Sequence, residues 1–360
     1  MQLLNITFFG QPLRLEGSMA GWQQLYWSNQ LVAQQDASAS TGTESQLRFS
    51  LKKGNEELQC HIDLTLVWQP FKLIYQVFAN GESIATGERT TTDIEKQVPI
   101  VKPPKVRKAG TIGLMSLAFK LFKSAKVIKV VFAGASLAAY SWMFSLPFAL
   151  SLLGALVFHE YGHIKAMQHF GMRTKGIYLI PFFGGLALSD EKINTRWQDV
   201  VISIMGPTFG LIMSLVSLLL YWLTGEIFFA ALASLNALLN LFNLLPILPL
   251  DGGHILKSIS FSMNSWVGLV VCVGAAAAGV WLSYRFGLAL LGLLLLVGSV
   301  EILMEWKLRH NSHLLPLDRY GQLFSSVWYV ITVSALVGVI MYFAGTGDAI
   351  LGLPLTILQS

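Results

Sequence analysis

Two histidines four positions apart, and the glutamate that follows the first, are the residues of this chain best suited to chemistry. They form the stretch HEYGH, which contains His159, Glu160 and His163. On an α-helix, residues i and i+4 share a face about 6 Å apart along the axis, so both imidazoles can bind one metal ion. Glu160 can take a proton from an attacking water and return it to a leaving amine. The pattern predicts a metal-dependent hydrolytic centre, and a pair of packed histidines is the alternative.

The sequence around this motif is apolar, as the stretch ALVFHEYGHI shows. A charged side chain near the middle of a bilayer costs roughly 2.5–3.5 kcal/mol on insertion scales, so an ionisable residue there is a functional candidate. A bound metal ion would give all three polar side chains a partner. The apolar surroundings therefore favour a metal site over packed histidines.

A catalytic zinc usually has three protein ligands, so a third ligand is expected. Asp251 is the best candidate, because it lies in FNLLPILPLDGGHI between a broken apolar helix and a new helical segment. Pro246 and Pro249 free backbone groups that only a protein-lined or watery cavity tolerates. The other acidic residues after Glu160 lie mostly at span ends or in loops. His254, one turn after Asp251, is interpreted as a packing or supporting residue.

The composition predicts a polytopic α-helical membrane protein. Of 360 residues, 54% are hydrophobic and only 12% are charged, whereas soluble domains carry about 25% charged residues. The net charge of +5 is modest. We predict six or seven transmembrane helices, near residues 130–146, 147–170, 198–223, 226–246, 265–284, 287–306 and 325–344, the fourth continuing past its break into 251–262.

Residues 1–100 differ from the rest of the chain, because they are polar and contain short alternating runs. The runs at 58–68 and 71–78 predict strands, and Asn80-Gly81 predicts a hairpin turn. We expect a small all-β domain, most simply a β-sandwich.

A basic segment at 101–129 follows, with eight Lys/Arg and no Asp/Glu. Next to a membrane span, this composition favours anionic lipid over nucleic acid as a partner. Its second half predicts either an amphipathic helix on the membrane surface or the polar start of the first span. The transmembrane domain would then occupy 130–344, with its core at 147–262, and 345–360 would form a C-terminal tail.

Basic residues of the predicted loops fall on one side of the membrane if the spans alternate, apart from Arg285. The positive-inside rule then places the N-terminal domain and the end of the HEYGH helix on the cytoplasmic side. No signal peptide is predicted at the N-terminus. We expect a multi-pass protein of a bacterial inner membrane.

HEYGH together with NLLPILPLDGG resembles the site-2 protease family of intramembrane zinc metalloproteases (M50-type). The resemblance covers roughly 147–262 and implies one Zn²⁺ per chain, bound by His159, His163 and Asp251, with Glu160 as the catalytic base. It also implies a transmembrane protein substrate, such as a membrane-anchored regulator. No gap between the predicted spans can hold the PDZ domain that many relatives carry.

Three weaker matches extend the resemblance. Asn243 matches a family asparagine that is implicated in binding the substrate backbone, although it could instead cap the broken helix. GPTFG, with Gly206 and Gly210, matches a small-residue motif of the family's central helix, and close helix packing explains it equally well. GIYLIPFFGGLALS at 176–189 resembles a membrane-associated hairpin, whose Gly184 and Gly185 would lie at a strand edge that binds substrate.

Two other functions use the same residues. A transporter or metal sensor could bind metal through these ligands, but transporters typically show a doubled pattern of interrupted helices, and only one is visible. A catalytically inactive family member could serve as a scaffold, although the intact Glu160 argues against it. The N-terminal domain could filter substrates or bind a cytoplasmic partner.

Overall fold

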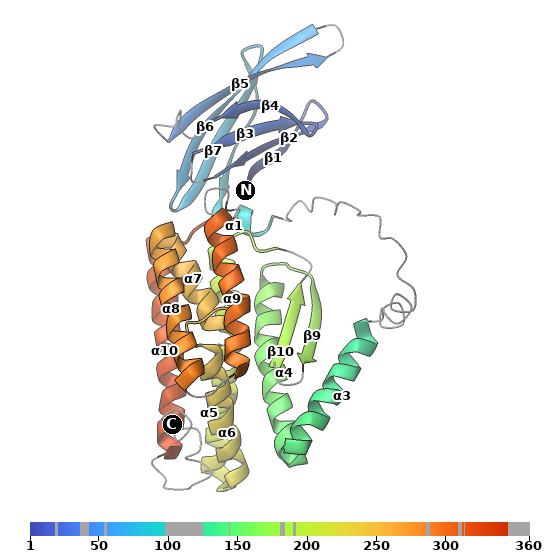
Figure 1. Ribbon diagram of the computed structural model, residues 1–360. Coiled ribbons are helices and arrows are strands. Elements are labelled where there is room, and N and C mark those ends of the chain that lie inside the picture. The colour runs from blue at the N-terminus through green and yellow to red at the C-terminus, as the bar shows by residue number, and fades with distance from the viewer. Residues whose placement is uncertain are drawn as a thin grey trace, which may run out of the picture.

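The computed structural model describes residues 1–18, 21–36, 43–53, 56–97, 125–143, 145–180, 184–189, 192–285, 289–308, 312 and 314–344. Its N-terminal part is all-β, and the remainder is helical apart from one hairpin (Figure 1). The strands are β1 (Gln2–Phe8), β2 (Gln11–Gly17), β3 (Gln23–Trp27), β4 (Gln30–Gln35), β5 (Glu44–Lys53), β6 (Glu56–Trp68), β7 (Phe71–Ala79), β8 (Glu82–Thr90), β9 (Thr174–Ile180) and β10 (Gly184–Ser189). The helices are α1 (Thr91–Glu95), α3 (Ala125–Met143), α4 (Leu146–His169), α5 (Arg196–Thr224), α6 (Ile227–Asn243), α7 (Asp251–Met263), α8 (Ser265–Arg285), α9 (Ala289–Leu308) and α10 (Arg319–Ala344).

The N-terminal strands form two four-stranded antiparallel sheets, β1-β2-β3-β4 and β5-β6-β7-β8. Alternate side chains of both sheets point into one shared core, as strand geometry requires. The β7–β8 turn places Asn80 and Gly81 at positive φ, which suits these two residue types. The prediction of an all-β N-terminal region is confirmed, and the two predicted strands lie within β6 and β7.

Each predicted span falls on a helix of the structure. Within the described residues, α5, α8 and α10 are long and apolar enough to cross a membrane, and α6 is a shorter apolar helix. The number of six or seven spans stays a prediction. The helix at the first predicted span, α3, starts at Ala125. Most of the predicted basic segment and the C-terminal tail lie outside the described residues.

α5 is the central helix, and its ends are set by local sequence. The Thr195 hydroxyl accepts a hydrogen bond from the Gln198 amide at 3.0 Å, and the Gln198 side chain accepts one from the Thr195 amide at 3.1 Å. This capping box satisfies two otherwise unpaired donors. Gly225 ends the helix in the left-handed conformation. α5 packs against α4, α6, α7 and α10, so a residue on α5 can reach most of the helical core.

The β-domain is docked on the end of α5 by polar and apolar contacts. The Asn194 amide donates to the carbonyl oxygens of Ile94 and Gln97, at 3.1 and 2.6 Å. The Gln198 side chain donates to the Glu95 carbonyl at 3.0 Å. Leu315, from the segment between α9 and α10, is buried in the core of the β-domain. These contacts tie the two parts of the molecule together at the start of α5.

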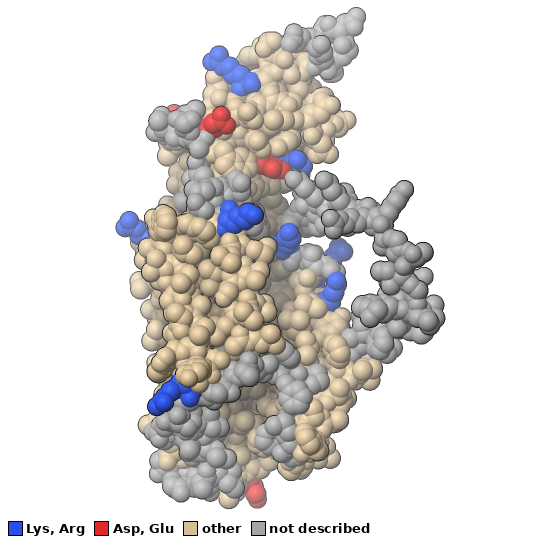
Figure 2. Space-filling model, viewed as in Figure 1, with Lys and Arg blue, Asp and Glu red and all other residues tan. Residues whose placement is uncertain are grey.

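Charged side chains are unevenly distributed over the helical part. On the face shown in Figure 2, Lys and Arg gather where the helices meet the β-domain, and the flanks of the helices are almost free of charge. Many large apolar side chains of α8, α9 and α10 are exposed, among them Leu296, Leu303 and Ile331. An apolar belt with a basic end is the pattern expected of helices embedded in a bilayer.

Candidate active site

His159 and His163 lie one turn apart on α4 and point at the same spot. Their Nε2 atoms are 3.0 Å apart, and both side chains are buried. Asp251, the first residue of α7, places Oδ2 at 3.3 Å from His159 Nε2 and 3.5 Å from His163 Nε2. The structure thus brings together two residues of one helix and a third that lies 88 positions further along the chain.

Hydrogen bonds to the other ring nitrogens define the tautomer of each histidine. His163 Nδ1 lies 2.6 Å from the Ile202 carbonyl oxygen, which can only accept. His159 Nδ1 lies 2.7 Å from Asn240 Oδ1. The amide nitrogen of Asn240 already donates to the Asn236 carbonyl at 2.7 Å, which fixes the amide orientation. Both histidines therefore carry their proton on Nδ1 and present an Nε2 lone pair to the same point.

The donor set fits one metal ion. Two facing lone pairs and a carboxylate oxygen repel one another unless a cation lies among them. Asp251 Oδ2 is buried and accepts no hydrogen bond from the described residues. Ligands at 2.0–2.1 Å from a tetrahedral zinc would be about 3.3 Å apart, close to the separations of the three donor atoms here. Among the described residues, this is the one group of three such side chains that can hold a metal ion.

The break between α6 and α7 delivers Asp251 to the histidines. The chain turns through 244–250, and the Tyr329 hydroxyl of α10 donates to the free Leu244 carbonyl at 2.6 Å. A Cβ on Gly252 would overlap the Leu244 carbonyl, and one on Gly253 would overlap the backbone of Ile247. Both glycines are therefore needed for the close packing of α7 against the break. Backbone groups that a broken helix leaves unpaired must find other hydrogen-bond partners at membrane depth, and the Leu244 carbonyl finds one in Tyr329.

Small residues on α5 make room for the site. A Cβ on Gly206 would overlap the His163 ring, and one on Gly210 would overlap the amide of Asn240. Gly162, between the two histidines, packs in the same way against the Met205 carbonyl. The motif GPTFG therefore serves packing, and what it packs against is the candidate metal site itself.

Glu160 lies next to the histidines and under the β9–β10 hairpin. The residue is buried, and its carboxylate accepts a hydrogen bond from the Ala187 backbone. A Cβ on Gly185 would overlap the Glu160 side chain, so this glycine permits β10 to approach. Gly184 adopts a φ of +94°, which favours glycine. β9 pairs with one edge of β10, and Ala187 meets Glu160 on the other.

The remaining predicted residues do not contact the metal-binding atoms of the site. Asn243 is the last residue of α6, is partly exposed and makes no hydrogen bond to either histidine. Pro246 and Pro249 lie in the break before α7. His254 is not part of the metal group and contacts Lys257 at 3.3 Å instead.

Sequence reasoning missed the polar pair Asn236 and Asn240 of α6. Both are fully buried, and the Asn236 amide donates to the Gly210 carbonyl at 2.6 Å and to the Ser214 hydroxyl at 2.8 Å. A signal was present, since two asparagines at i and i+4 are unusual in an apolar helix. The pair forms a hydrogen-bonded support that runs from α5 through α6 to His159.

Asn240→Ala is expected to weaken metal binding by about 10–100-fold, the usual effect of removing a hydrogen-bond partner of a ligand. Without Asn240, the His159 ring loses the acceptor that fixes its tautomer and orientation. Zinc affinity of the purified full chain, measured by competition with a chelator, tests this. Asn243→Ala is the matched control one turn along α6 and should bind zinc as the wild type does; equal affinities for all three proteins would contradict the role of Asn240.

Comparison with known proteins agrees with this geometry. Residues 147–226 and 223–269 match the family model for peptidase family M50. Over 147–269 the chain is therefore similar to peptidase family M50, the site-2 protease family. The matched region contains His159, Glu160, His163 and Asp251.

Curated relatives give the same picture. The chain is 34% identical over 179 residues to a protein of Synechocystis sp. named "Putative zinc metalloprotease", covering 48% of this chain and 47% of the relative. It is 29% identical over 197 residues to a zinc metalloprotease of Methanocaldococcus jannaschii, covering 52% and 56%. It is 27% identical over 188 residues to stage IV sporulation protein FB of Bacillus subtilis, covering 48% and 63%. The chain thus spans about half the length of the curated relatives it matches.

Proposed function

We propose that this protein is an intramembrane zinc endopeptidase that hydrolyses peptide bonds in or near transmembrane segments of membrane-anchored regulatory proteins. The observation that carries the proposal is the convergence of His159, His163 and Asp251 on one point, with Glu160 beside them. The names of the relatives and the family match support zinc as the metal. One ion per chain is proposed because the described residues contain one group of side chains that can hold it.

His159, His163 and Asp251 would hold the zinc ion, and Glu160 would act as general base. Bound zinc polarises the scissile carbonyl and increases the acidity of water. Glu160 takes the proton of the attacking water and transfers it to the nitrogen of the leaving amine, so that the peptide bond breaks with no net change of protonation. The buried carboxylate suits this task because little bulk water competes for its protons.

Substrate would be positioned by the edge of β10 that does not pair with β9. A transmembrane helix must unwind before it can be cut, because its backbone is otherwise hydrogen-bonded within the helix. An unwound segment can add to an exposed strand edge by backbone hydrogen bonds. β10 offers such an edge next to Glu160, with Gly184 and Gly185 allowing close approach. Asn243, partly exposed at the end of α6, would contact the substrate backbone.

Ala187→Pro is expected to lower cleavage by roughly 10–100-fold and to leave zinc binding intact. Proline lacks the N–H that Ala187 directs at Glu160, and a hydrogen bond to a charged group contributes about 1.5–3 kcal/mol. Cleavage rate and zinc content of the purified variants test this. Ala187→Val keeps the N–H and should cleave nearly as the wild type does; a fully active Ala187→Pro would contradict the role of the Ala187 N–H beside Glu160.

The direct experiment places the full chain in lipid vesicles with a panel of single transmembrane segments that carry soluble tags. Cleavage should stop when the metal is chelated and return when zinc is added. Mass spectrometry should place the new termini within or at the border of the apolar segment. Transport of zinc ions across the vesicle membrane, without any cleavage, would instead support a transporter and overturn the proposal.

The same proposal includes the location and division of the chain. The gathering of Lys and Arg at the end of the helices near the β-domain supports a multi-pass protein of a bacterial inner membrane with the β-domain in the cytoplasm (Figure 2). The proposed division is a β-domain at 1–100, a basic linker at 101–129, a protease domain at 130–344 and a tail at 345–360. The β-domain would select substrates or bind a cytoplasmic partner.

A further inference from the structure

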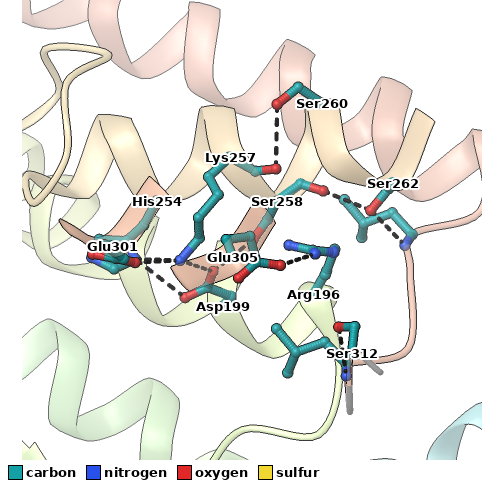
Figure 3. A network of polar contacts seen from close by, with 12 residues as sticks. Arg196, Asp199, His254, Lys257, Ser258, Ser260, Ser262, Glu301, Glu305 and Ser312 are labelled. Atoms are coloured by element: carbon teal, nitrogen blue, oxygen red, sulfur yellow. Dashed lines mark hydrogen bonds and ion pairs between the residues drawn. The ribbon is translucent and has the colours of Figure 1, made fainter. Parts of the chain in front are cut away.

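A cluster of charged residues joins α5, α7 and α9 (Figure 3). At its centre is Asp199 of α5, which is buried and meets three side chains of α7. The Ser258 hydroxyl donates to Asp199 Oδ2 at 2.6 Å, and Lys257 Nζ lies 3.6 Å from the same oxygen. His254 Nδ1 lies 3.6 Å from Asp199 Oδ1. Lys257 also donates to Glu301 of α9 at 2.6 Å.

The placement of Asp199 and Ser258 along their helices connects this cluster to the metal site. On α5, Gly206 follows Asp199 by seven residues, and on α7 Ser258 follows Asp251 by seven residues. Seven residues are almost two helical turns, so each pair shares one face of its helix, about 10 Å apart along the axis. Gly206 lies against the two histidine rings that meet Asp251. α5 and α7 are therefore related at two levels: at Asp199 they are in direct contact, and two turns away both flank the histidines of the metal site.

Because the contact of Asp199 with Lys257 and Ser258 is buried, it specifies one arrangement of α5 and α7. Asp199, Lys257 and Ser258 are at most 8% exposed, so their polar groups depend on each other for partners. A slip or rotation of α7 against α5 would leave the buried Asp199 carboxylate without the Ser258 hydrogen bond and without Lys257, which is strongly unfavourable. The same slip would carry Asp251 away from the histidines. One arrangement of the two helices satisfies both levels together.

We propose that Asp199 is a positioning residue for the metal ligand Asp251: by holding Ser258 and Lys257, it fixes the register and rotation of α7 against α5. The inference rests on the proposed metal site. It assigns a role to buried residues that bind neither metal nor substrate. Asp199 acts two helical turns away from the ligand, through the rigid helix that connects Ser258 to Asp251.

Zinc affinity of the detergent-purified full chain, measured by competition with a chromophoric chelator, is the test. Asp199→Ala should bind zinc about 10–100-fold more weakly, the size of effect seen when support for a ligand is lost. Asp199→Asn keeps an acceptor for Ser258 but loses the charge that pairs with Lys257, so its loss should be smaller. Ser258→Ala removes the hydrogen bond alone and covers the case in which Asp199→Ala does not fold.

Glu305→Gln is the matched control. It removes the ion pair between Arg196 of α5 and Glu305 of α9, and Glu305 lies one turn further along α9 than Glu301. This variant should unfold at a lower temperature and yet bind zinc as the wild type does. If Asp199 had a merely structural role, its variants would likewise unfold at a lower temperature and bind zinc as the wild type does.

The outcomes separate the two proposals. Wild-type zinc affinity in both Asp199→Asn and Ser258→Ala, with weakened affinity in Asp251→Ala, would overturn the positioning role and leave the metal site standing. Wild-type affinity in Asp251→Ala as well would show that the metal site itself is wrongly assigned. Weakened affinity in the Asp199 and Ser258 variants, with none in Glu305→Gln, supports the inference.

Discussion

Replacing Glu160 with glutamine is expected to leave zinc in place and to slow peptide cleavage by about 10²–10⁴-fold, the usual contribution of a general base. Glutamine has the shape of glutamate, and its amide can still accept the hydrogen bond from the Ala187 backbone. It cannot take the proton of the attacking water, so the chemical step fails while the site stays assembled. Zinc content and cleavage rate of the same preparation measure both effects.

Glu226→Gln provides the control for the Glu160 variant. Glu226 is exposed, precedes α6 and makes no side-chain capping bond to it, so the same chemical change there should leave the cleavage rate unaltered. Undiminished cleavage in Glu160→Gln would show that another group is the base. Loss of zinc together with cleavage would show that Glu160 holds the site together.

Asp251→Ala is expected to weaken zinc binding by about 10²–10³-fold and to abolish cleavage. Zinc bound by four protein ligands contributes about 10–16 kcal/mol, so one ligand accounts for roughly 2.5–4 kcal/mol. The histidines alone leave the ion with only two protein ligands. The metal content of the purified variant after dialysis against a weak chelator measures the loss, and retention of a full equivalent of zinc would remove Asp251 from the ligand set.

The metal ligands could be predicted from sequence because their residue types are costly where they occur. HEYGH is a rare spacing, and Asp251 stands out in a proline-broken apolar segment. The β-domain strands were also predictable, since period-two alternation indicates a sheet with one buried face. These inferences rest on local sequence patterns and on the free-energy cost of burying a charge. They do not require knowing which helices pack together.

The supports of the site could not be predicted, because they depend on contacts between distant segments. Asn243 attracted attention through its motif, whereas Asn240, three residues earlier, is the one that contacts His159. Asp199 looked like an ordinary carboxylate at the end of a span, and its partner Ser258 follows 59 positions later. The docking of Leu315 in the β-domain likewise joins segments whose pairing no local pattern specifies.

X-ray absorption spectroscopy at the zinc edge, on the full chain loaded with one equivalent of zinc, tests the central claim most directly. The account predicts two imidazole nitrogens and carboxylate oxygen within about 2.0–2.2 Å of the metal, with no sulfur. It also predicts that one imidazole contribution disappears in His163→Ala and that the spectrum is unchanged in Cys272→Ser. A sulfur shell near 2.3 Å, or a spectrum that His163→Ala leaves unaltered, would contradict the assignment of His159, His163 and Asp251 as the zinc site.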